Sequence, residues 1–171
     1  MELKRVLLPL DNSEFSRQAL GIVKKQLSPD TAVLTLLRVA EEPKLPDGRP
    51  SPPALHGAVL SYNDMKPRMG ATYPIYLDEL KVSLEAELEH ELAADIARLE
   101  AEGYSVTAKI RFGDPAKEII DEAKDHDLIL MATHGRSGLT RVLMGSVAEK
   151  VLRQSTLPIL LIKPERVEVG I

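Results

Sequence analysis

Residues 128–153, LILMATHGRSGLTRVLMGSVAEKVLR, decide the fold of this chain. The stretch begins with four large apolar residues, Leu128 to Met131, which are typical of a strand buried on both faces. A loop with Gly135 and Gly138 follows, and Gly145-Ser146 then opens an amphipathic helix. A strand, a glycine-containing loop and a helix N-terminus together present backbone N–H groups and a partial positive charge to an anion. Our working hypothesis is that this segment binds the phosphates of a nucleotide.

The rest of the chain repeats the alternation of strand and helix. Apolar runs at 6–10 and 32–39 predict two buried strands, and the helical spacing between them predicts a helix. A long amphipathic helix over 77–99, an alternating edge strand over 104–112, a helix from Pro115 and a last strand over 157–162 are also predicted. We therefore expect a doubly wound, Rossmann-like open α/β sheet of five parallel strands in the order 3-2-1-4-5, with helices on both faces.

The region from Glu41 to Pro74 interrupts this alternation. Six prolines lie between Pro43 and Pro67, and the region has neither a two-residue nor a 3.6-residue period. We predict a single domain over 1–171 with a Pro-rich insertion at about 41–74. This insertion is either a poorly ordered surface segment or a lid or partner-binding arm. The acidic residues of the following helix are interpreted as a solvated face: Glu85, Glu87, Glu89 and Glu91.

Composition excludes several classes of protein. The chain has 171 residues, a net charge of −4 and no cysteine, which argues against a nucleic-acid binder and rules out disulfides and thiolate metal sites. No apolar run approaches the roughly 18 residues of a membrane span. No two histidines have the i, i+4 spacing of a helical zinc site, so we expect no protein-ligated metal. Asp125-His126-Asp127 is interpreted as a solvated turn. We expect a soluble, cytoplasmic protein.

In a doubly wound sheet, ligands bind beyond the carboxyl ends of the strands. The residues that follow those ends are Asp11, Val39, Ala40, Gly113 and the run from Ala132 to Gly138. Asp11 has two roles open to it, as a ligand for a ribose or base and as a cap of the first helix.

Ser146 also has two explanations. A bound phosphate would use the N–H groups of Gly145, Ser146 and Val147. The run from Ser146 to Glu149 also matches the S-x-x-E capping box, which gives Ser146 a structural role. Spacing alone does not decide between the two.

The small residues after the fourth strand resemble the ATP-binding motif of the universal stress protein family. That motif is G-x2-G-x9-G-[ST], and this chain has Ala132, Gly135, Gly145 and Ser146 at its fixed positions, departing only at Ala132. Alanine is small, although it disfavours a positive φ. The segments VLLPLDNSE, RFGDPAKEII, MATHGRSG, GSVAEKVL and PILLIKP extend the resemblance over nearly the whole chain.

The resemblance implies an adenine-nucleotide-binding stress-response or signalling module whose ATP occupancy modulates dimer or partner interactions. It implies that any Mg²⁺ is held by the phosphates, and that a homodimer forms by antiparallel pairing of the last strand, Pro158 to Ile162. The alternatives are a slow ATPase and a nucleotide-free interaction protein acting through the 41–74 insertion. No catalytic residue stands out, so we expect at most weak hydrolysis. The implied nucleotide-binding residues are Pro9, Leu10, Asp11, Val39, Met131, Ala132, His134, Gly135, Arg136, Gly138, Gly145, Ser146 and Val147.

Overall fold

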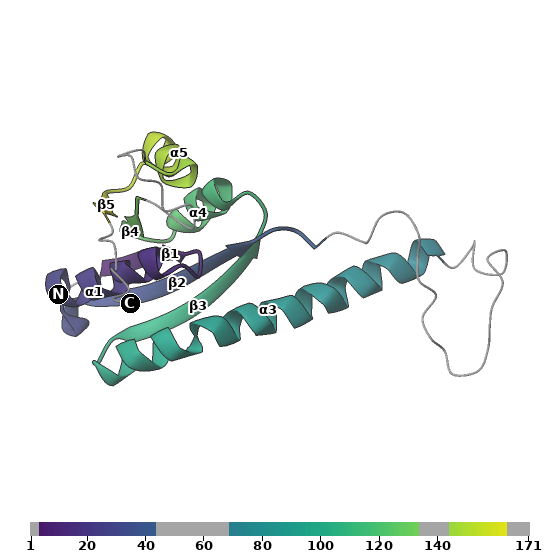
Figure 1. The fold of residues 1–171 in the computed structure, drawn as a ribbon, viewed down its shortest axis with the longest axis horizontal. Helices are drawn as coiled ribbons and strands as arrows, with labels where there is room; N and C mark the ends of the chain where they lie inside the picture. The colour runs from purple at the N-terminus through teal and green to yellow at the C-terminus, as the bar shows by residue number, and fades with distance from the viewer. Residues whose placement is uncertain (1–3, 44–68, 134–143, 164–171) are drawn as a thin grey trace, which may run out of the picture. The chain divides into compact units, whose positions relative to one another are not determined.

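The computed structural model describes residues 4–43, 69–133 and 144–163, with residues 69–77 described at the backbone only. Strands and helices alternate along the chain (Figure 1). The strands are β1 (Lys4–Leu10), β2 (Ala32–Ala40), β3 (Ser105–Phe112), β4 (Leu128–Ala132) and β5 (Ile159–Ile162). The helices are α1 (Glu14–Gln26), α3 (Met69–Ala101), α4 (Pro115–Ala123) and α5 (Ser146–Gln154), with a 3₁₀ turn η1 (Pro29–Thr31) before β2.

The five strands form one parallel sheet in the order β3-β2-β1-β4-β5, which confirms the predicted topology. β1 lies at the centre, because it pairs with β2 along its whole length and with β4 on its other side. β3 is an edge strand, as its alternating sequence predicts.

Each face of the sheet has its own helices. On one face, α4 and α5 bury Ile119 and Val151 against Leu7, Leu37 and Ile129, all of which are at most 2% exposed. The alternation of a strand sends Leu8 and Leu10 to the opposite face. On that face α1 is tied to the C-terminal part of α3 by an ion pair described below. Figure 1 shows α4 and α5 lying side by side.

The chain packs as two compact units, 1–41 with 88–171 and 42–87. The helix α3 is continuous through both units, and within the second unit Lys81 forms a 2.7 Å ion pair with Glu42. Because α3 begins at Met69, the last part of the predicted insertion, 69–74, is helical, which corrects that boundary. The single domain with an insertion stays a prediction.

The interpretation of His126 as part of a solvated turn is wrong. His126 is 6% exposed, and its Nδ1 donates to the carbonyl of Glu122 at 2.9 Å. Its Nε2 lies 2.9 Å from the hydroxyl of Thr35 on β2. Tertiary contact overrides the polar local sequence, because a histidine with both ring nitrogens hydrogen-bonded is well tolerated inside a protein.

Glu122 is itself a buried ion-pair centre. Its carboxylate is 2% exposed and accepts hydrogen bonds from Lys109 and Arg111, both on β3. Burial raises the pKa of the Glu122 carboxyl, but the hydrogen bonds and charges of Lys109 and Arg111 bring it below its ordinary value. The three residues thus tie the edge strand to α4.

None of the helices in the described part of the chain combines the length and the apolar character needed to span a membrane.

Candidate functional site

The strand order reverses between β1 and β4. From β1 the chain moves outward through β2 to β3, and it then returns to the other side of β1 to form β4 and β5. The helices that follow β1 and β4 therefore pack on opposite faces, and in doubly wound sheets the crevice that binds ligands is expected at the carboxyl ends of two such strands. Leu7 pairs with Ile129, and the strands end three residues further on, at Leu10 and Ala132. The predicted residues from both strands thus border this switch point.

Asp11 lies in a short loop that is closed by its own side chains. One oxygen of the Asp11 carboxylate accepts from the N–H of Ser13 at 3.1 Å and from the Ser13 hydroxyl at 2.5 Å. Ser13 is the N-cap of α1, because its hydroxyl accepts from the N–H of Ser16 at 3.1 Å. The cap is therefore Ser13, and Asp11 supports the cap indirectly. Asn12, between them, has a φ of +66°, a left-handed conformation that asparagine tolerates better than most residues.

Apolar residues from the predicted list gather on the α4–α5 face of the sheet. Met131 belongs to the buried cluster of that face, and Val39 and Val147 pack against it. Pro9 lies two residues after Leu7 and therefore points to the same face. Ala132 is 8% exposed and Leu10 is 4% exposed, so both belong more to the core than to an open surface.

The N-terminus of α5 differs from the predicted capping box. The N-cap is Gly145, and Ser146 is the first helical residue, without a side-chain capping hydrogen bond. The capping-box interpretation of Ser146 is therefore wrong. Of the three N–H groups expected to donate to a phosphate, that of Gly145 is already used, because it donates to the carbonyl of Thr133 at 2.7 Å. The N–H of Glu149 closes the first turn onto the Gly145 carbonyl, and the N–H groups of Ser146, Val147 and Ala148 have no acceptor within the helix.

Thr133 joins three elements through its backbone. Its N–H donates to the carbonyl of Ile162 at the end of β5 (2.8 Å), and its carbonyl accepts from Gly145. The ends of β4 and β5 and the start of α5 are thereby held together. Four predicted residues, His134, Gly135, Arg136 and Gly138, lie outside the described residues.

The carboxyl ends of β2 and β3 are occupied by structural contacts. The N–H of Gly113 donates to the carbonyl of Ala40 at 2.9 Å. Gly113 has a φ of +143°, and a Cβ there would lie 3.0 Å from the carboxylate of Glu118. Asp114 then caps α4 by accepting from the N–H of Lys117 at 3.0 Å, as the Gly-Asp-Pro sequence predicts. These residues are explained by the fold, which leaves the β1–β4 crevice as the candidate site.

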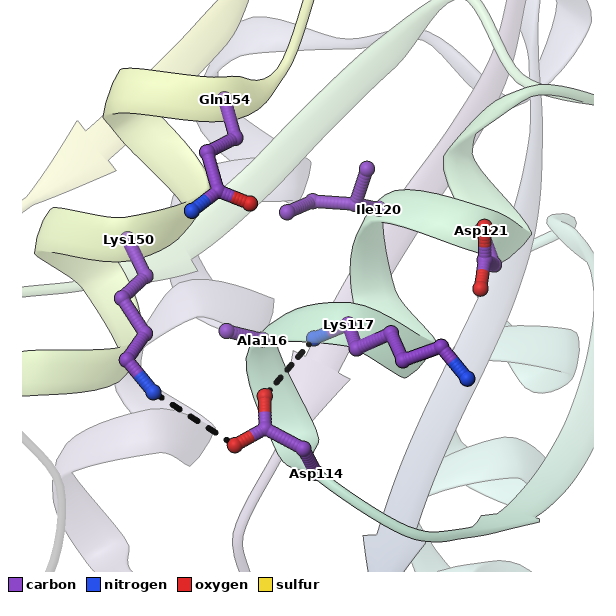
Figure 2. A pocket seen from close by; sticks show the side chains of 7 residues that line it. All are labelled: Asp114, Ala116, Lys117, Ile120, Asp121, Lys150 and Gln154. Atoms are coloured by element: carbon purple, nitrogen blue, oxygen red, sulfur yellow. Dashed lines mark hydrogen bonds and ion pairs between the residues drawn. The ribbon is translucent and has the colours of Figure 1, made fainter.

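A second concavity, of about 490 Å³, lies between α4 and α5 (Figure 2). Lys150 lies 3.5 Å from the Asp114 carboxylate. The hydrogen bond from the Lys117 backbone, followed by the charge and hydrogen bond of Lys150, lowers the pKa of the Asp114 carboxyl. None of the predicted site residues is among those that line it: Asp114, Ala116, Lys117, Ile120, Asp121, Lys150 and Gln154.

Arg17 was missed by sequence reasoning. Its guanidinium contacts the backbone of Asn12 and the side chain of Asp95 on α3. Nothing in the local sequence distinguishes Arg17 from a solvated helical arginine, because Asp95 lies 78 positions away. Among the described residues, no group of three or more histidines and carboxylates is arranged to hold a metal ion.

The family model and the curated relatives that match this chain belong to the same family. The model of the universal stress protein family matches residues 54–163. Universal stress protein MJ0577 of Methanocaldococcus jannaschii is 30% identical over 162 residues, which cover 94% of this chain and 94% of that protein. A solved structure of MJ0577 superimposes with a TM-score of 0.71 at 28% identity, covering 98% of this chain and 100% of that one.

Two more distant structures share the fold. A universal stress protein family protein from Arabidopsis thaliana with AMP bound has a TM-score of 0.58 at 18% identity, over 95% of this chain and 92% of that one. A universal stress protein in complex with cAMP has a TM-score of 0.53 at 17% identity, over 95% of this chain and 98% of that one.

Proposed function

This chain belongs to the universal stress protein family, and we propose that it binds an adenine nucleotide, ATP foremost, in the crevice between the ends of β1 and β4. Nucleotide occupancy then modulates contacts with a second copy or a protein partner in a stress response.

The N-terminus of α5 is the observation that carries this proposal. Three consecutive N–H groups, of Ser146, Val147 and Ala148, have no acceptor in the helix, and the helix dipole adds a partial positive charge there. Ser146 is exposed, so its hydroxyl is accessible to a phosphate oxygen. The hydrogen bond from Gly145 to Thr133 fixes the helix terminus at the end of β4. Together these groups fit a phosphate, and any Mg²⁺ would be held by phosphate oxygens and water.

The other side of the crevice suits a nucleoside. The Asp11 carboxylate holds its loop by accepting hydrogen bonds from the backbone and the hydroxyl of Ser13, and an ionised carboxylate acts only as an acceptor. It is therefore suited to accept from a ribose hydroxyl or a base amino group. Val39, which is partly buried at the end of β2 on the α4–α5 face, supplies apolar surface for a base. The AMP and cAMP named for the two distant relatives support an adenine nucleotide as the ligand class.

The exposed edge of β5 supports a homodimer. β5 is the last strand of the sheet, and the side chain of Leu160 on it is 37% exposed. An edge strand offers unpaired backbone groups to a second strand. The Thr133 N–H bond to Ile162 connects this edge to the helix that would hold the phosphates, which gives occupancy a physical route to the dimer surface.

Nucleotide content tests the proposal. The chain has no tryptophan, so a bound nucleotide dominates the absorbance near 260 nm of the purified protein. We expect heat to release an adenine nucleotide identifiable by mass spectrometry, and calorimetric titration of the stripped protein with ATP and Mg²⁺ to show saturable binding. Absence of both co-purified nucleotide and binding at millimolar ATP would overturn the proposal. Incubation with ATP for hours, followed by measurement of released phosphate, separates binding from slow hydrolysis.

A further inference from the structure

Arg17, on the first turn of α1, connects two segments that are far apart in the sequence. Its Nε donates to the Asp95 carboxylate on α3 at 2.8 Å, and its Nη1 donates to the carbonyl of Asn12 at 3.2 Å. Its Nη2 lies 3.5 Å from the Glu91 carbonyl, also on α3. The guanidinium has a planar fork of five donors, so it can hold all three acceptors in one fixed geometry, which a lysine cannot do.

The contact at Asn12 acts on an unusual part of the backbone. Asn12 has a φ of +66° and lies between Asp11 and the cap residue Ser13. Asparagine adopts a left-handed conformation more readily than most residues, and surrounding contacts help to hold it in place. Two sets of contacts do so here: the hydrogen bonds from Ser13 to the Asp11 carboxylate within the loop, and the Arg17 bond to the Asn12 carbonyl from outside.

The ion pair with Asp95 is sheltered from solvent. The Asp95 side chain is 14% exposed and that of Arg17 is 33% exposed. A partly buried, charge-assisted hydrogen bond is shorter and stronger than a neutral one. Arg17 therefore has little freedom to leave Asn12, and the position of the loop is coupled to that of α3.

We propose that Arg17 is a positioning residue for the nucleoside side of the nucleotide site. By fixing the Asn12–Ser13 peptide and anchoring it to α3, Arg17 sets the direction in which the neighbouring Asp11 carboxylate meets a ribose or base. This inference rests on the proposed function, and it adds a form of control: a displacement of α3 changes the affinity for the nucleoside. The phosphate donors on α5 belong to the other face of the sheet and do not depend on Arg17.

The test compares two ligands that share only part of the nucleotide. Adenosine reports on the nucleoside side, and inorganic tripolyphosphate reports on the N-terminus of α5. For Arg17→Met we expect the Kd of adenosine and of ATP to rise by the same factor, roughly 5- to 30-fold for the loss of charge-assisted hydrogen bonds, with the Kd of tripolyphosphate unchanged. Asp95→Asn keeps the Arg17 bond to Asn12 and should cause a smaller rise. The double variant should bind no more weakly than Arg17→Met alone.

Arg5→Met is the matched control. It also removes an arginine and an ion pair, but at the amino end of β1, roughly 16 Å from Leu10 at about 3.3 Å per residue. We expect it to leave all three Kd values unchanged. If wild-type protein binds ATP but Arg17→Met binds adenosine equally well, the inference is wrong while the proposed function stands. Equal weakening of adenosine and tripolyphosphate overturns it too, because that marks a general loss of structure.

Two further outcomes are decisive. If wild-type protein binds neither ATP nor adenosine, the proposed function fails and takes the inference with it. If Arg17→Met does not fold, Asp95→Asn decides by the same comparison of adenosine with tripolyphosphate, and an unchanged adenosine Kd in that variant overturns the inference.

Discussion

The carbonyl of Thr133 accepts a 2.7 Å hydrogen bond from the N–H of Gly145. The residue that follows β4 is thus joined directly to the N-cap residue of α5. Gly145 serves as an N-cap with φ and ψ of −61° and 148°, values open to any residue. Glycine is therefore not required there by the backbone conformation, and under the proposed function its small size serves the close approach of a phosphate.

Gly145→Val should separate folding from binding. The valine side chain would occupy the approach to the N–H groups of α5, so we expect the Kd of ATP to rise at least tenfold. The protein should remain folded, at a cost of about 1 kcal/mol for a poorer N-cap. Calorimetric titration and urea unfolding measure the two effects. Gly21→Ala is the control, because a Cβ at Gly21 meets nothing within 4 Å and should leave affinity unchanged. Wild-type affinity in a folded Gly145→Val protein would contradict the placement of the phosphates.

Ser13 and Ser146 should differ in their contribution to stability. Ser13 caps α1, so we expect Ser13→Ala to lower the free energy of unfolding by about 1 kcal/mol. Ser146 makes no capping hydrogen bond, and Ser146→Ala should change the free energy of unfolding by less than about 0.5 kcal/mol while weakening ATP binding. Urea unfolding of both variants without nucleotide measures the difference. Equal losses would restore the capping-box role of Ser146.

Asp127 should make the free energy of unfolding depend on pH in the acidic range. Hydrogen bonds from the Arg5 side chain and backbone lower the pKa of the Asp127 carboxyl from 3.8 to about 2. A carboxyl with a lowered pKa contributes stability above its unfolded pKa and loses that contribution as the pH falls through the folded pKa. The contribution should therefore be complete above pH 4 and disappear between about pH 4 and pH 2. Urea midpoints across this range should fall more steeply for the wild type than for Arg5→Met, and parallel curves would contradict the pairing.

His126→Phe should destabilise the protein without altering the site. Phenylalanine fills the buried space but leaves the Thr35 hydroxyl without its partner on the ring. We expect a loss of about 1–3 kcal/mol in the free energy of unfolding, the usual result of a buried polar group left unpaired. His90→Phe, at an exposed position of α3, is the control and should lie within about 0.5 kcal/mol of the wild type. A neutral effect of His126→Phe would show that the buried contacts contribute little.

Leu160→Lys should weaken self-association if two copies of the chain pair through β5. Leu160 is 37% exposed, so a lysine there can reach solvent in the monomer, but it would place like charges close together if two β5 strands pair. We expect light scattering coupled to size-exclusion chromatography to give a dimer for the wild type and a smaller mass for the variant. Leu152→Lys, on the exposed side of α5, is the comparison at an equally apolar position. A wild-type monomer, or a dimer unchanged in Leu160→Lys, would rule out this interface.

Local patterns predicted the sheet because each element carries its own signal. Continuous apolar runs marked β1, β2 and β4, and Gly113-Asp114-Pro115 marked the start of α4. The alternation of strands with helices and the handedness of crossovers indicated a doubly wound parallel sheet, and the order 3-2-1-4-5 was expected as that of a Rossmann-like fold. None of these inferences needs contacts between residues distant in the sequence.

What failed depends on distant contacts or on a single dihedral angle. His126 is buried because Thr35, 91 positions away, lies beside it. S-x-x-E describes Ser146 as a cap, but the backbone turns one residue earlier, at Gly145. For the candidate site, strand order was enough to place Asp11, Met131 and Ala132 around one crevice. Binding of a nucleotide at these residues stays a prediction, and no local signal pointed to Arg17.

The central position of β1 has a consequence for synthesis of the chain. β1 pairs with β2 early, but its other edge stays open until β4, which ends at Ala132, has left the ribosome. At roughly 5–20 residues per second, the nascent chain carries this apolar, unpaired edge for several seconds. An exposed strand edge is a template for pairing with another chain. Until β4 has been synthesised, the open edge of β1 can therefore pair with another chain, unless a chaperone covers it or association is slow.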